Sequence, residues 1–444
     1  MGMTLPPRPI EIGQRSFYGI PQSFGLGVSD RRHHLYCIGK TGTGKSTMLR
    51  NLILQDILAG NGVGVVDPHG DLAESLLDSI PSWRIEDVVY FNPADTENPI
   101  GLNLLECPND IEEHLIPSQM TSIFRSMWPD AWGPRLEHIL YATCASLVSY
   151  GGQTVLGIHR MLTDSEFRGR VVKQLDDPFL RSFWEDEFGN YSANFSSEAI
   201  APVLNKVGRL IMSPILRNII GQPKSGFDAA FTMDRKRIFI ANLSKGLLGE
   251  EKSNLLGSIL VTKFQLAAMA RASKPEEKRE DFYLYIDEFH NFLTDSFASM
   301  LGEARKYHLC LTLAHQHLAQ LSERVRSAVL GNAGSIISFR VGSADAELLA
   351  KEFDGVFPIR RFTDLSNYTV CAKMIVQSDL TDPFIGWTLP DAGIRFGRKD
   401  TIIRRSRERY SKQKHRVEER LERWLHPKPQ IPPTRRTYRR RLES

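Results

Sequence analysis

Short apolar runs alternate with amphipathic stretches over most of the chain. The runs are apolar at consecutive positions, which is typical of strands buried on both faces of a parallel sheet. The predicted strands are Leu35–Ile38, Val63–Val66, Val88–Phe91, Ile238–Leu243, Phe282–Ile286, Leu309–Ala314 and Ile336–Val341. The predicted helices between them include Lys45–Ala59, Asn254–Arg271 and Ala344–Phe353.

One stretch interrupts this alternation. From Asp110 to about Asp234 there is almost no strand signal, and several segments are amphipathic at helical spacing. The clearest helical stripe consists of Leu136, Ile139, Leu140, Cys144 and Leu147. We therefore expect an all-α domain inserted between the early and the late strands of the sheet.

The net charge of the 444 residues is only +4, but the charge is unevenly distributed. From residue 398 onward there are 17 Lys/Arg and 6 Asp/Glu, a local charge of +11, so the first 397 residues carry −7. Two interpretations stay open for this tail: it binds a polyanion such as nucleic acid or a membrane surface, or it is a disordered solubilising segment. A helix is predicted over Ile403–Leu425, with Ile403, Tyr410, Val417 and Trp424 on one side, and Pro432–Ser444 is expected to be disordered.

Composition favours a cytoplasmic protein. No run approaches the ~18 uninterrupted apolar residues of a membrane span, and the first 20 residues contain no apolar signal core. The five cysteines lie far apart without a Cys-x-x-Cys pair, which argues against a zinc knuckle or a disulfide framework.

The strongest motif is Gly39-Lys-Thr-Gly-Thr-Gly-Lys45-Ser46-Thr47, which fits the pattern G-x-x-x-x-G-K-[ST] between a predicted strand and a predicted helix. Its glycines let backbone N–H groups turn toward phosphates, and Lys45 supplies a mobile cation for the β- and γ-phosphates. The Ser46 hydroxyl is expected to ligate Mg²⁺. The predicted phosphate-binding residues are Gly39, Lys40, Thr41, Gly42, Thr43, Gly44, Lys45, Ser46 and Thr47.

A second site is predicted where the strand Phe282–Ile286 ends in Asp287 and Glu288. Open α/β sheets bind ligands beyond the carboxyl ends of their strands. We expect Asp287 to hold Mg²⁺ through its water shell and Glu288 to polarise the attacking water. Acids that merely face solvent are the alternative, which the nearby P-loop disfavours.

Three more residues are candidates for catalysis. Gln316, after the run Leu309–Ala314, could contact both the γ-phosphate and the water, or it could be an ordinary loop amide. Arg305 and Arg340 are candidates for neutralising transition-state charge from a neighbouring subunit, and a surface ion pair is the alternative for each. Asp67 and Asp71 lie at the same predicted edge, where they would support Mg²⁺ or shape a turn.

These features predict the α/β class: a RecA-like P-loop NTPase with a mostly parallel central sheet, an inserted all-α domain and a basic C-terminal tail. The predicted division is 1–32 for an N-terminal lead-in, 33–109 and 235–397 for the two parts of the NTPase domain, 110–234 for the inserted domain, and 398–444 for a helical or disordered tail.

Six motifs follow one another in a specific order: the P-loop, Val66-Asp-Pro-His-Gly-Asp71, Asn242-Leu-Ser-Lys-Gly246, Ile286-Asp-Glu-Phe289, Glu303-Ala-Arg-Lys-Tyr307 and Ala314-His-Gln316. Together they resemble the HerA/FtsK superfamily of hexameric DNA-pumping ATPases, and most nearly the TraG/TraD-type coupling proteins of conjugative type IV secretion. The resemblance spans about residues 33–390. It implies ATP and Mg²⁺ as cofactors, DNA as a partner and a homo-hexamer, and it makes Arg305 the better candidate for the arginine that acts in trans.

Several functions remain open at this point. The leading hypothesis is an ATP-driven ring motor that translocates DNA in conjugation or a related transfer system. The alternatives are a HerA-like repair or defence translocase with a separate nuclease, a protein-secretion motor, and a nucleotide-dependent assembly switch. A relaxase partner would indicate conjugation, and a nuclease partner repair or defence.

The sequence differs from the membrane-bound members of the family in one respect. Membrane-bound coupling proteins usually begin with transmembrane helices, and this sequence shows none. We therefore expect either a cytoplasmic protein that a membrane or secretion-system subunit recruits to the inner face of the membrane, or a soluble branch of the superfamily.

Overall fold

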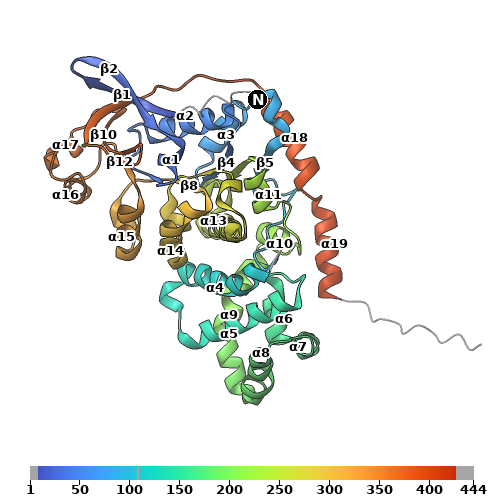
Figure 1. The fold of residues 1–444 in the computed structure, drawn as a ribbon. Helices are drawn as coiled ribbons and strands as arrows, with labels where there is room; N and C mark the ends of the chain where they lie inside the picture. The colour runs from blue at the N-terminus through green and yellow to red at the C-terminus, as the bar shows by residue number, and fades with distance from the viewer. Residues whose placement is uncertain (1–8, 108–109, 427–444) are drawn as a thin grey trace, which may run out of the picture.

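One large sheet organises the molecule (Figure 1). The structure is a computed structural model and describes residues 9–107 and 110–426. Within these residues the strands of the sheet follow the order β2-β1-β13-β10-β9-β3-β8-β7-β4-β6-β5. The neighbours β9 to β5 are parallel: β9 (Ser335–Ser338), β3 (Leu35–Ile38), β8 (Leu309–His315), β7 (Phe282–Ile286), β4 (Gly62–Asp67), β6 (Ile238–Asn242) and β5 (Val88–Phe91). The strands predicted from continuous apolar runs are thereby confirmed, although the last of them, predicted over Ile336–Val341, ends at Ser338.

An antiparallel flank extends the sheet beyond β9. It consists of β10 (Thr369–Lys373), β13 (Phe384–Thr388), β1 (Ile10–Phe17) and β2 (Ile20–Leu26). A separate small hairpin pairs β11 (Ile375–Val376) with β12 (Asp379–Leu380). The described part of the lead-in predicted over 1–32 thus contributes two strands, which the sequence analysis did not foresee because polar and exposed residues interrupt both of them.

Helices cover both faces of the sheet (Figure 1). Side chains of α2 and α3 share one apolar core with Cys37, Val65 and Tyr285 of the sheet. Side chains of α13 share the opposite core with Tyr36 and Leu284. Successive strand residues therefore point into different cores, which explains why these strands are apolar at most of their positions. The helices of the sheet body are α1 (Val28–Arg31), α2 (Lys45–Leu58), α3 (Asp71–Leu77), α12 (Lys245–Leu248), α13 (Glu250–Ala270), α14 (Asp295–Glu303), α15 (Glu323–Asn332), α16 (Ser343–Glu352) and α17 (Ile359–Thr363).

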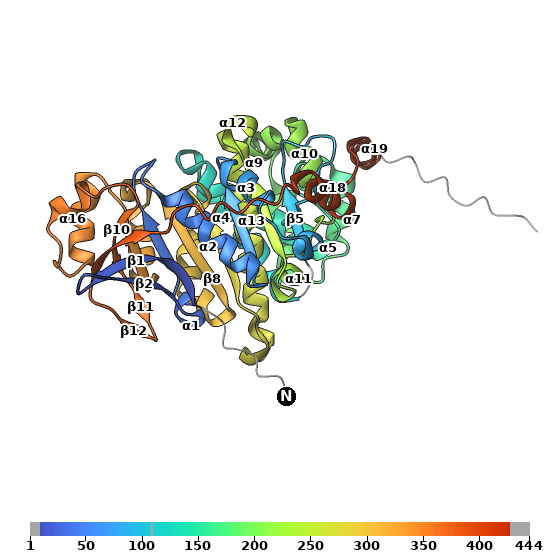
Figure 2. The ribbon, with the colours of Figure 1, turned by 90° about the horizontal axis from the view of Figure 1, so that it is seen from above.

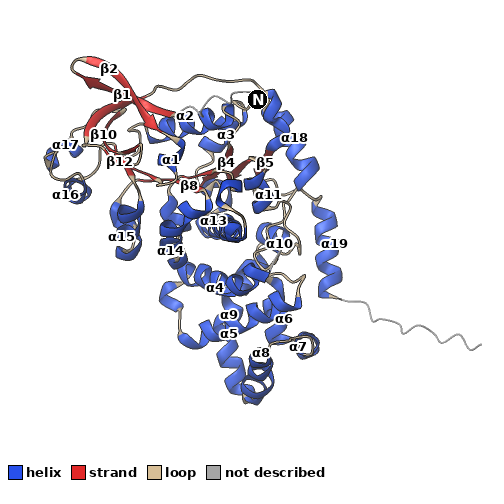
Figure 3. Ribbon diagram, viewed as in Figure 1, coloured by secondary structure: helices blue, strands red, loops and turns tan. Residues whose placement is uncertain are grey.

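Beyond the loop of residues 92–107, the described part of the segment between β5 and β6 consists of helices joined by loops (Figure 3). Its helices are α4 (Asp110–Met127), α5 (Pro134–Tyr150), α6 (Leu156–Thr163), α7 (Ser165–Val172), α8 (Pro178–Ser182), α9 (Ala193–Met212), α10 (Pro214–Ile220) and α11 (Ala229–Asp234). The predicted helical stripe on α5 is buried in the core that the insertion shares with the sheet body. The all-α insertion is present as expected, and the exact domain boundaries stay a prediction.

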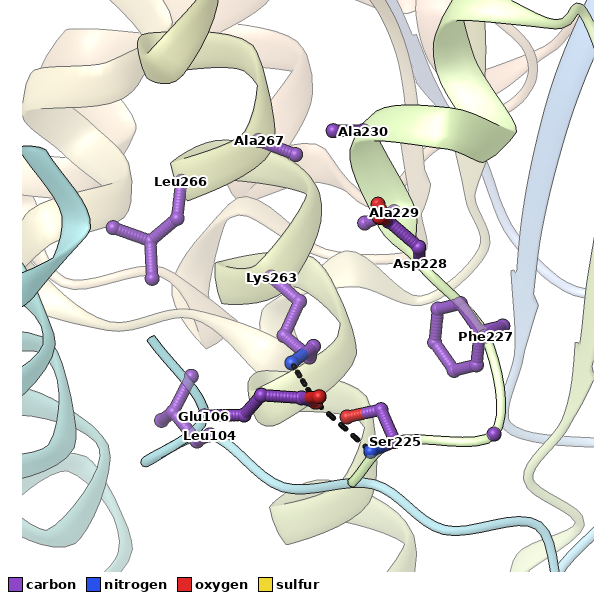
Figure 4. A pocket seen from close by; sticks show the side chains of 11 residues that line it. Leu104, Glu106, Ser225, Phe227, Asp228, Ala229, Ala230, Lys263, Leu266 and Ala267 are labelled. Atoms are coloured by element: carbon purple, nitrogen blue, oxygen red, sulfur yellow. Dashed lines mark hydrogen bonds and ion pairs between the residues drawn. The ribbon is translucent and has the colours of Figure 1, made fainter. Parts of the chain in front are cut away.

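Both chain crossings between the sheet body and the insertion run past α13 (Figure 4). Glu106, on the entering segment, accepts a hydrogen bond from the Ser225 N–H on the leaving segment at 2.8 Å. The same carboxylate lies 3.8 Å from Lys263 Nζ of α13. These residues border a cavity of about 350 Å³ that Leu104 and Phe227 also line. Through these contacts α13 holds the two crossings together.

α13 is also apolar enough to resemble a membrane span. Among the described residues, the segment Glu250–Ser273 passes by length and composition, and the bent pair Ala193–Met212 and Pro214–Ile220 would form a second candidate. However, 78% of the apolar window in Glu250–Ser273 is buried inside the fold. Its apolar surface is therefore used for packing under the sheet.

The basic tail forms two helices that run along the outside of the molecule (Figure 2). They are α18 (Lys399–Tyr410) and α19 (Lys414–Leu425), which we call the C-terminal strap. The prediction of a single helix over Ile403–Leu425 is wrong, because α18 ends at Tyr410 and a second helix begins only at Lys414. There the N–H of Lys412 donates to the carbonyl oxygen of Pro99 at 3.2 Å, and Ser411 forms a bridge with Ile100.

The strap packs on both parts of the molecule. In α18, Ile402 is buried, and the Ser406 hydroxyl accepts a hydrogen bond from the Tyr90 N–H of β5 at 2.8 Å. In α19, Val417 and Leu421 bury against Leu156 of the insertion. The predicted disordered segment Pro432–Ser444 lies outside the described residues.

Acidic residues of the body pair with the cations of the strap. Arg407 lies 2.6 Å from Asp95, Lys399 3.0 Å from Glu74, and Lys414 3.2 Å from Glu97. Arg405 and Arg409 both pair with Glu86. The asymmetry of charge along the sequence therefore corresponds, over the described residues, to attraction between tail and body.

We expect Leu421→Ala to lower the free energy of unfolding by about 2 kcal/mol, because truncating a buried leucine removes apolar contacts and leaves a cavity. The matched control is Leu425→Ala on the same helix, where the side chain is 52% exposed; its effect should stay below about 0.5 kcal/mol. Urea unfolding followed by circular dichroism measures both. Equal effects would show that α19 does not pack through Leu421.

Candidate nucleotide site

The P-loop closes around its own lysine. Two glycines of the loop adopt a positive φ, +76° at Gly42 and +117° at Gly44, which side chains would disfavour. α2 begins at Lys45, whose ammonium is buried and donates to the carbonyl oxygens of Gly39 and Lys40. Lys45 is thus held by loop carbonyls at the place where phosphate oxygens would compete for it. The sequence-predicted strand, loop and helix are confirmed.

Three neighbouring segments brace this loop. The N–H of Gly39 donates to the carbonyl oxygen of His315 at 3.3 Å, at the end of β8. The N–H of Lys40 donates to the carbonyl oxygen of Arg340 at 2.8 Å, just beyond β9. The carbonyl oxygen of Thr43 accepts the N–H of Tyr368 at 2.8 Å, just before β10. The loop is therefore fixed from both sides of β3.

A cavity of about 430 Å³ opens in front of the loop. It brings together the P-loop, the acids that follow β7 and the end of β8. Its lining residues are Thr41, Gly42, Gly44, Lys45, Ser46, Thr47, Asp67, His69, Asp71, Leu72, Asp287, Glu288, Gln316 and Tyr368.

Three buried carboxylates, those of Asp67, Asp287 and Glu288, line this cavity. The carboxylate of Asp67, at the end of β4, accepts hydrogen bonds from the backbone N–H of His69 at 2.8 Å and of Ala73 at 2.9 Å. These bonds fix the start of α3. This contact matches the turn role that the sequence left open for Asp67. Burial, Glu288 and Asp67, in decreasing order, raise the pKa of Asp287 to about 7, and Lys45 opposes them.

This charge arrangement fits a divalent cation. Oε2 of Glu288 is buried without a hydrogen-bond partner, and the neighbouring carboxylates repel each other. Mg²⁺ is commonly held by one or two protein oxygens together with water and substrate phosphates. Asp287 and the exposed Ser46 hydroxyl both border the cavity and would hold such an ion. No cluster of three or more metal-ligating His, Cys, Asp or Glu side chains occurs in the described part of the chain.

Glu288 is held in a strained and specific position. Its φ of +44° is left-handed, which is uncommon for a residue with a side chain and is often found at functional sites. Its carbonyl oxygen accepts two hydrogen bonds from Asn291, from the backbone N–H at 3.0 Å and from the side-chain amide at 2.8 Å. His290 Nδ1 lies 3.5 Å from the unpartnered Oε2. Asn291 and His290 were not identified from the sequence.

Gln316 connects the glutamate to the P-loop. Its amide nitrogen donates to Oε1 of Glu288 at 2.8 Å, and its amide oxygen accepts the Thr41 hydroxyl at 2.9 Å. The structure thus places Gln316 where a sensor would lie. Because hydrogen bonds connect Thr41 to Gln316 and Gln316 to Glu288, a shift of the loop would be transmitted to the Glu288 carboxylate.

The two candidate arginines lie at different places. Arg305 is exposed and precedes β8, so it lies at the opposite edge of the sheet from Gln316, which follows β8; its guanidinium is 3.2 Å from His33 Nδ1. Arg340 lies beside its own P-loop and donates to the carbonyl oxygen of Leu365 and to Asn367, both at 3.2 Å. Arg305 therefore lies away from this chain's own site, whereas Arg340 is anchored next to it.

A P-loop between strand and helix, with carboxylates at the ends of neighbouring parallel strands, defines a P-loop NTPase of the RecA-like fold. Residues 19–369 match the model of the family described as type IV secretion-system coupling protein DNA-binding domain, and the chain belongs to this family. Proteins with curated descriptions give no match.

Solved structures support the fold. The bacterial conjugative coupling protein TrwBΔN70 in its unbound form is 19% identical with a TM-score of 0.60, over 86% of this chain and 90% of that one. TrwB in complex with ADP and Mg²⁺ is 18% identical with a TM-score of 0.58, over 85% and 89%. VirB4 of Thermoanaerobacter pseudethanolicus is 14% identical with a TM-score of 0.54, over 86% and 96%.

We expect Asp287→Asn to stabilise the protein without nucleotide or Mg²⁺, and to do so more at pH 8 than at pH 5. An aspartate of the unfolded chain ionises near pH 3.9, whereas the pKa of Asp287 in the fold is about 7. Wild-type stability therefore falls as the pH rises between these values, and the asparagine avoids this loss, which amounts to about 4 kcal/mol at most.

Thermal or urea unfolding in EDTA at both pH values measures this effect. Asp71→Asn is the matched control, because it also removes a carboxylate from this cavity. The side chain of Asp71 is exposed, whereas that of Asp287 is buried. A stabilisation by Asp287→Asn that is the same at pH 5 and pH 8 would contradict the electrostatic explanation.

Proposed function

We propose that the protein is an ATP-hydrolysing ring motor that translocates DNA in a conjugative or other type IV secretion system. The observation that carries this proposal is Glu288, a buried carboxylate with one unpartnered oxygen, held beside the P-loop by Gln316. The coupling-protein family supplies the second support, since its description names a DNA-binding domain. Complexes of TrwB with ADP and Mg²⁺ and with a non-hydrolysable ATP analogue support ATP and Mg²⁺ as cofactors.

The residues divide the chemistry between them. The phosphates bind the P-loop N–H groups, and Lys45 turns from its loop carbonyls to the β- and γ-phosphates. The free Oε2 of Glu288 accepts a hydrogen bond from the attacking water and its proton, while Gln316 keeps the carboxylate in place. Ser46 and Asp287 would hold Mg²⁺, which would supply positive charge for the transferred phosphoryl group.

A ring accounts for the position of Arg305. The arginine lies at the edge of the sheet away from this chain's own nucleotide site. It can therefore reach only the nucleotide site of a neighbouring subunit. We propose that it neutralises transition-state charge in trans in a homo-hexamer, with Arg340 as the second candidate. We also propose that residues 110–234 form the inserted domain and residues 398–444 the basic tail. The inserted domain would face the transferred substrate.

Stimulation of ATP hydrolysis by DNA tests the motor against the alternatives. Strong stimulation supports a translocase, and indifference to DNA supports an assembly switch. A nuclease that co-purifies would support repair or defence, whereas a relaxase or a membrane subunit of a secretion system would support conjugation at the inner face of the membrane. A DNA tether in the tail would rely on cations other than those paired with acids of the body, which are Lys399, Arg405, Arg407, Arg409 and Lys414.

We expect Glu288→Gln to bind ATP and to remain loaded, with hydrolysis slowed by about 100-fold or more, because the water loses its base while Asp287 still holds the metal. Lys45→Ala is the comparison and should lose both nucleotide affinity and turnover. Single-turnover hydrolysis and equilibrium nucleotide binding separate the two effects. A Glu288→Gln protein that loses binding but hydrolyses what it binds would refute this division of roles.

We expect mixtures of Arg305→Ala and Glu288→Gln subunits to regain ATPase activity, although each variant alone is inactive. Mixed rings contain interfaces at which an intact Arg305 meets an intact Glu288. Activity measured across mixing ratios, with co-assembly verified by mass spectrometry, is the readout. Arg340→Ala in place of Arg305→Ala is the matched control, and recovery with Arg340→Ala alone would transfer the role to that residue.

A further inference from the structure

One aromatic residue of the nucleotide cavity has no part in the chemistry described above. Tyr368 lies between α17 and β10 and borders the cavity, yet 46% of its surface is exposed. The order of the strands places it on the opposite side of β3 from the acids, because β9 and β10 lie on one side and β8, β7 and β4 on the other.

The backbone holds Tyr368 in an unfavourable conformation. Its φ of +62° is left-handed, where a bulky side chain is an outlier. Its N–H donates to the carbonyl oxygen of Thr43 at 2.8 Å, and its carbonyl oxygen accepts the N–H of Thr388 at 2.9 Å. These hydrogen bonds fix the residue between the P-loop and the end of β13. Strain of this kind at the rim of a binding cavity is a sign of function.

The ring packs directly on the P-loop. A Cβ atom built on Gly44 would lie 2.7 Å from Cδ1 of Tyr368, so only glycine leaves room for this ring. Gly44 immediately precedes the lysine of the loop. The aromatic ring therefore lies beside the phosphate-binding loop, at the border of the nucleotide cavity.

We propose that Tyr368 is the platform on which the base of the bound nucleotide stacks. The γ-phosphate end of the site is defined by Glu288 and Gln316 on the β8 side, so the nucleoside extends toward β9 and β10, where Tyr368 lies. An aromatic ring stacks on any base, so adenine and guanine nucleotides should gain similarly from it. This inference rests on the proposed nucleotide site and adds the residue that binds the base.

The test compares nucleotides with the same phosphates without a base. Tyr368→Asn removes the ring while asparagine tolerates the left-handed backbone, and Tyr368→Phe keeps the ring. Binding of ADP, GDP and inorganic pyrophosphate, each with Mg²⁺, is measured by calorimetry on the full chain. We expect Tyr368→Asn to weaken ADP and GDP binding by about 10- to 100-fold, to leave pyrophosphate affinity unchanged, and Tyr368→Phe to behave like the wild type.

A fluorescent ethenoadenosine diphosphate gives an independent readout, because stacking on an aromatic ring quenches its emission. Quenching in the wild type and in Tyr368→Phe, lost in Tyr368→Asn, supports the platform. Unchanged ADP affinity in Tyr368→Asn overturns the inference, and so does an equal loss of ADP and pyrophosphate, which would mean that the residue only supports the loop. A wild-type chain that binds neither ligand would instead contradict the nucleotide site itself, and this inference with it.

Discussion

The central constraint in this molecule is the burial of like charges at the carboxyl edge of a parallel sheet. Asp67, Asp287 and Glu288 lie at the ends of adjacent strands, and Lys45 offsets only part of their repulsion. Such a cluster destabilises the empty site, and a divalent cation with phosphates would relieve it. The backbone must hold the carboxylates in place until then. Two sets of hydrogen bonds supply this restraint. Asn291 donates to the carbonyl oxygen of the left-handed Glu288, and two backbone N–H groups donate to the carboxylate of Asp67.

The same edge of the sheet is connected to the more distant parts. α3, whose start is fixed by Asp67, carries Glu74, and Glu74 pairs with Lys399 of the strap at 3.0 Å. The strap continues past the chain crossings at Ile100 and ends against Leu156 in the insertion. A continuous set of contacts therefore runs from the nucleotide cavity to the helical insertion. Coupling along it would require two arrangements of the strap, which hydrogen exchange with and without nucleotide would detect.

The sequence predicts those parts of the fold whose stability is local or strongly periodic. The parallel strands are apolar at most positions because both faces are buried, and the P-loop has a fixed spacing, so both were predictable. β1, β2, β10 and β13 mix polar with apolar residues, and the hairpin of β1 and β2 joins the sheet only through the pairing of β1 with β13, far away in sequence. The break in the strap was hidden for a similar reason: it depends on the carbonyl oxygen of Pro99, more than 300 residues upstream of Lys412. Tyr368 lies in no motif, and only the fold brings it to the P-loop.

The positions of Arg305 and Glu288 have a consequence for assembly. The arginine precedes β8 and the glutamate follows the parallel strand β7, so the two lie at opposite edges of one sheet. A two-fold symmetric dimer would place identical surfaces together, so the arginine edge of each subunit would meet the arginine edge of its partner. An arginine that completes a neighbour's site from this position needs a head-to-tail contact instead, in which one edge meets the other. Repetition of that contact gives either a closed ring or an open helix, and equivalent sites at every interface follow only if the ring closes.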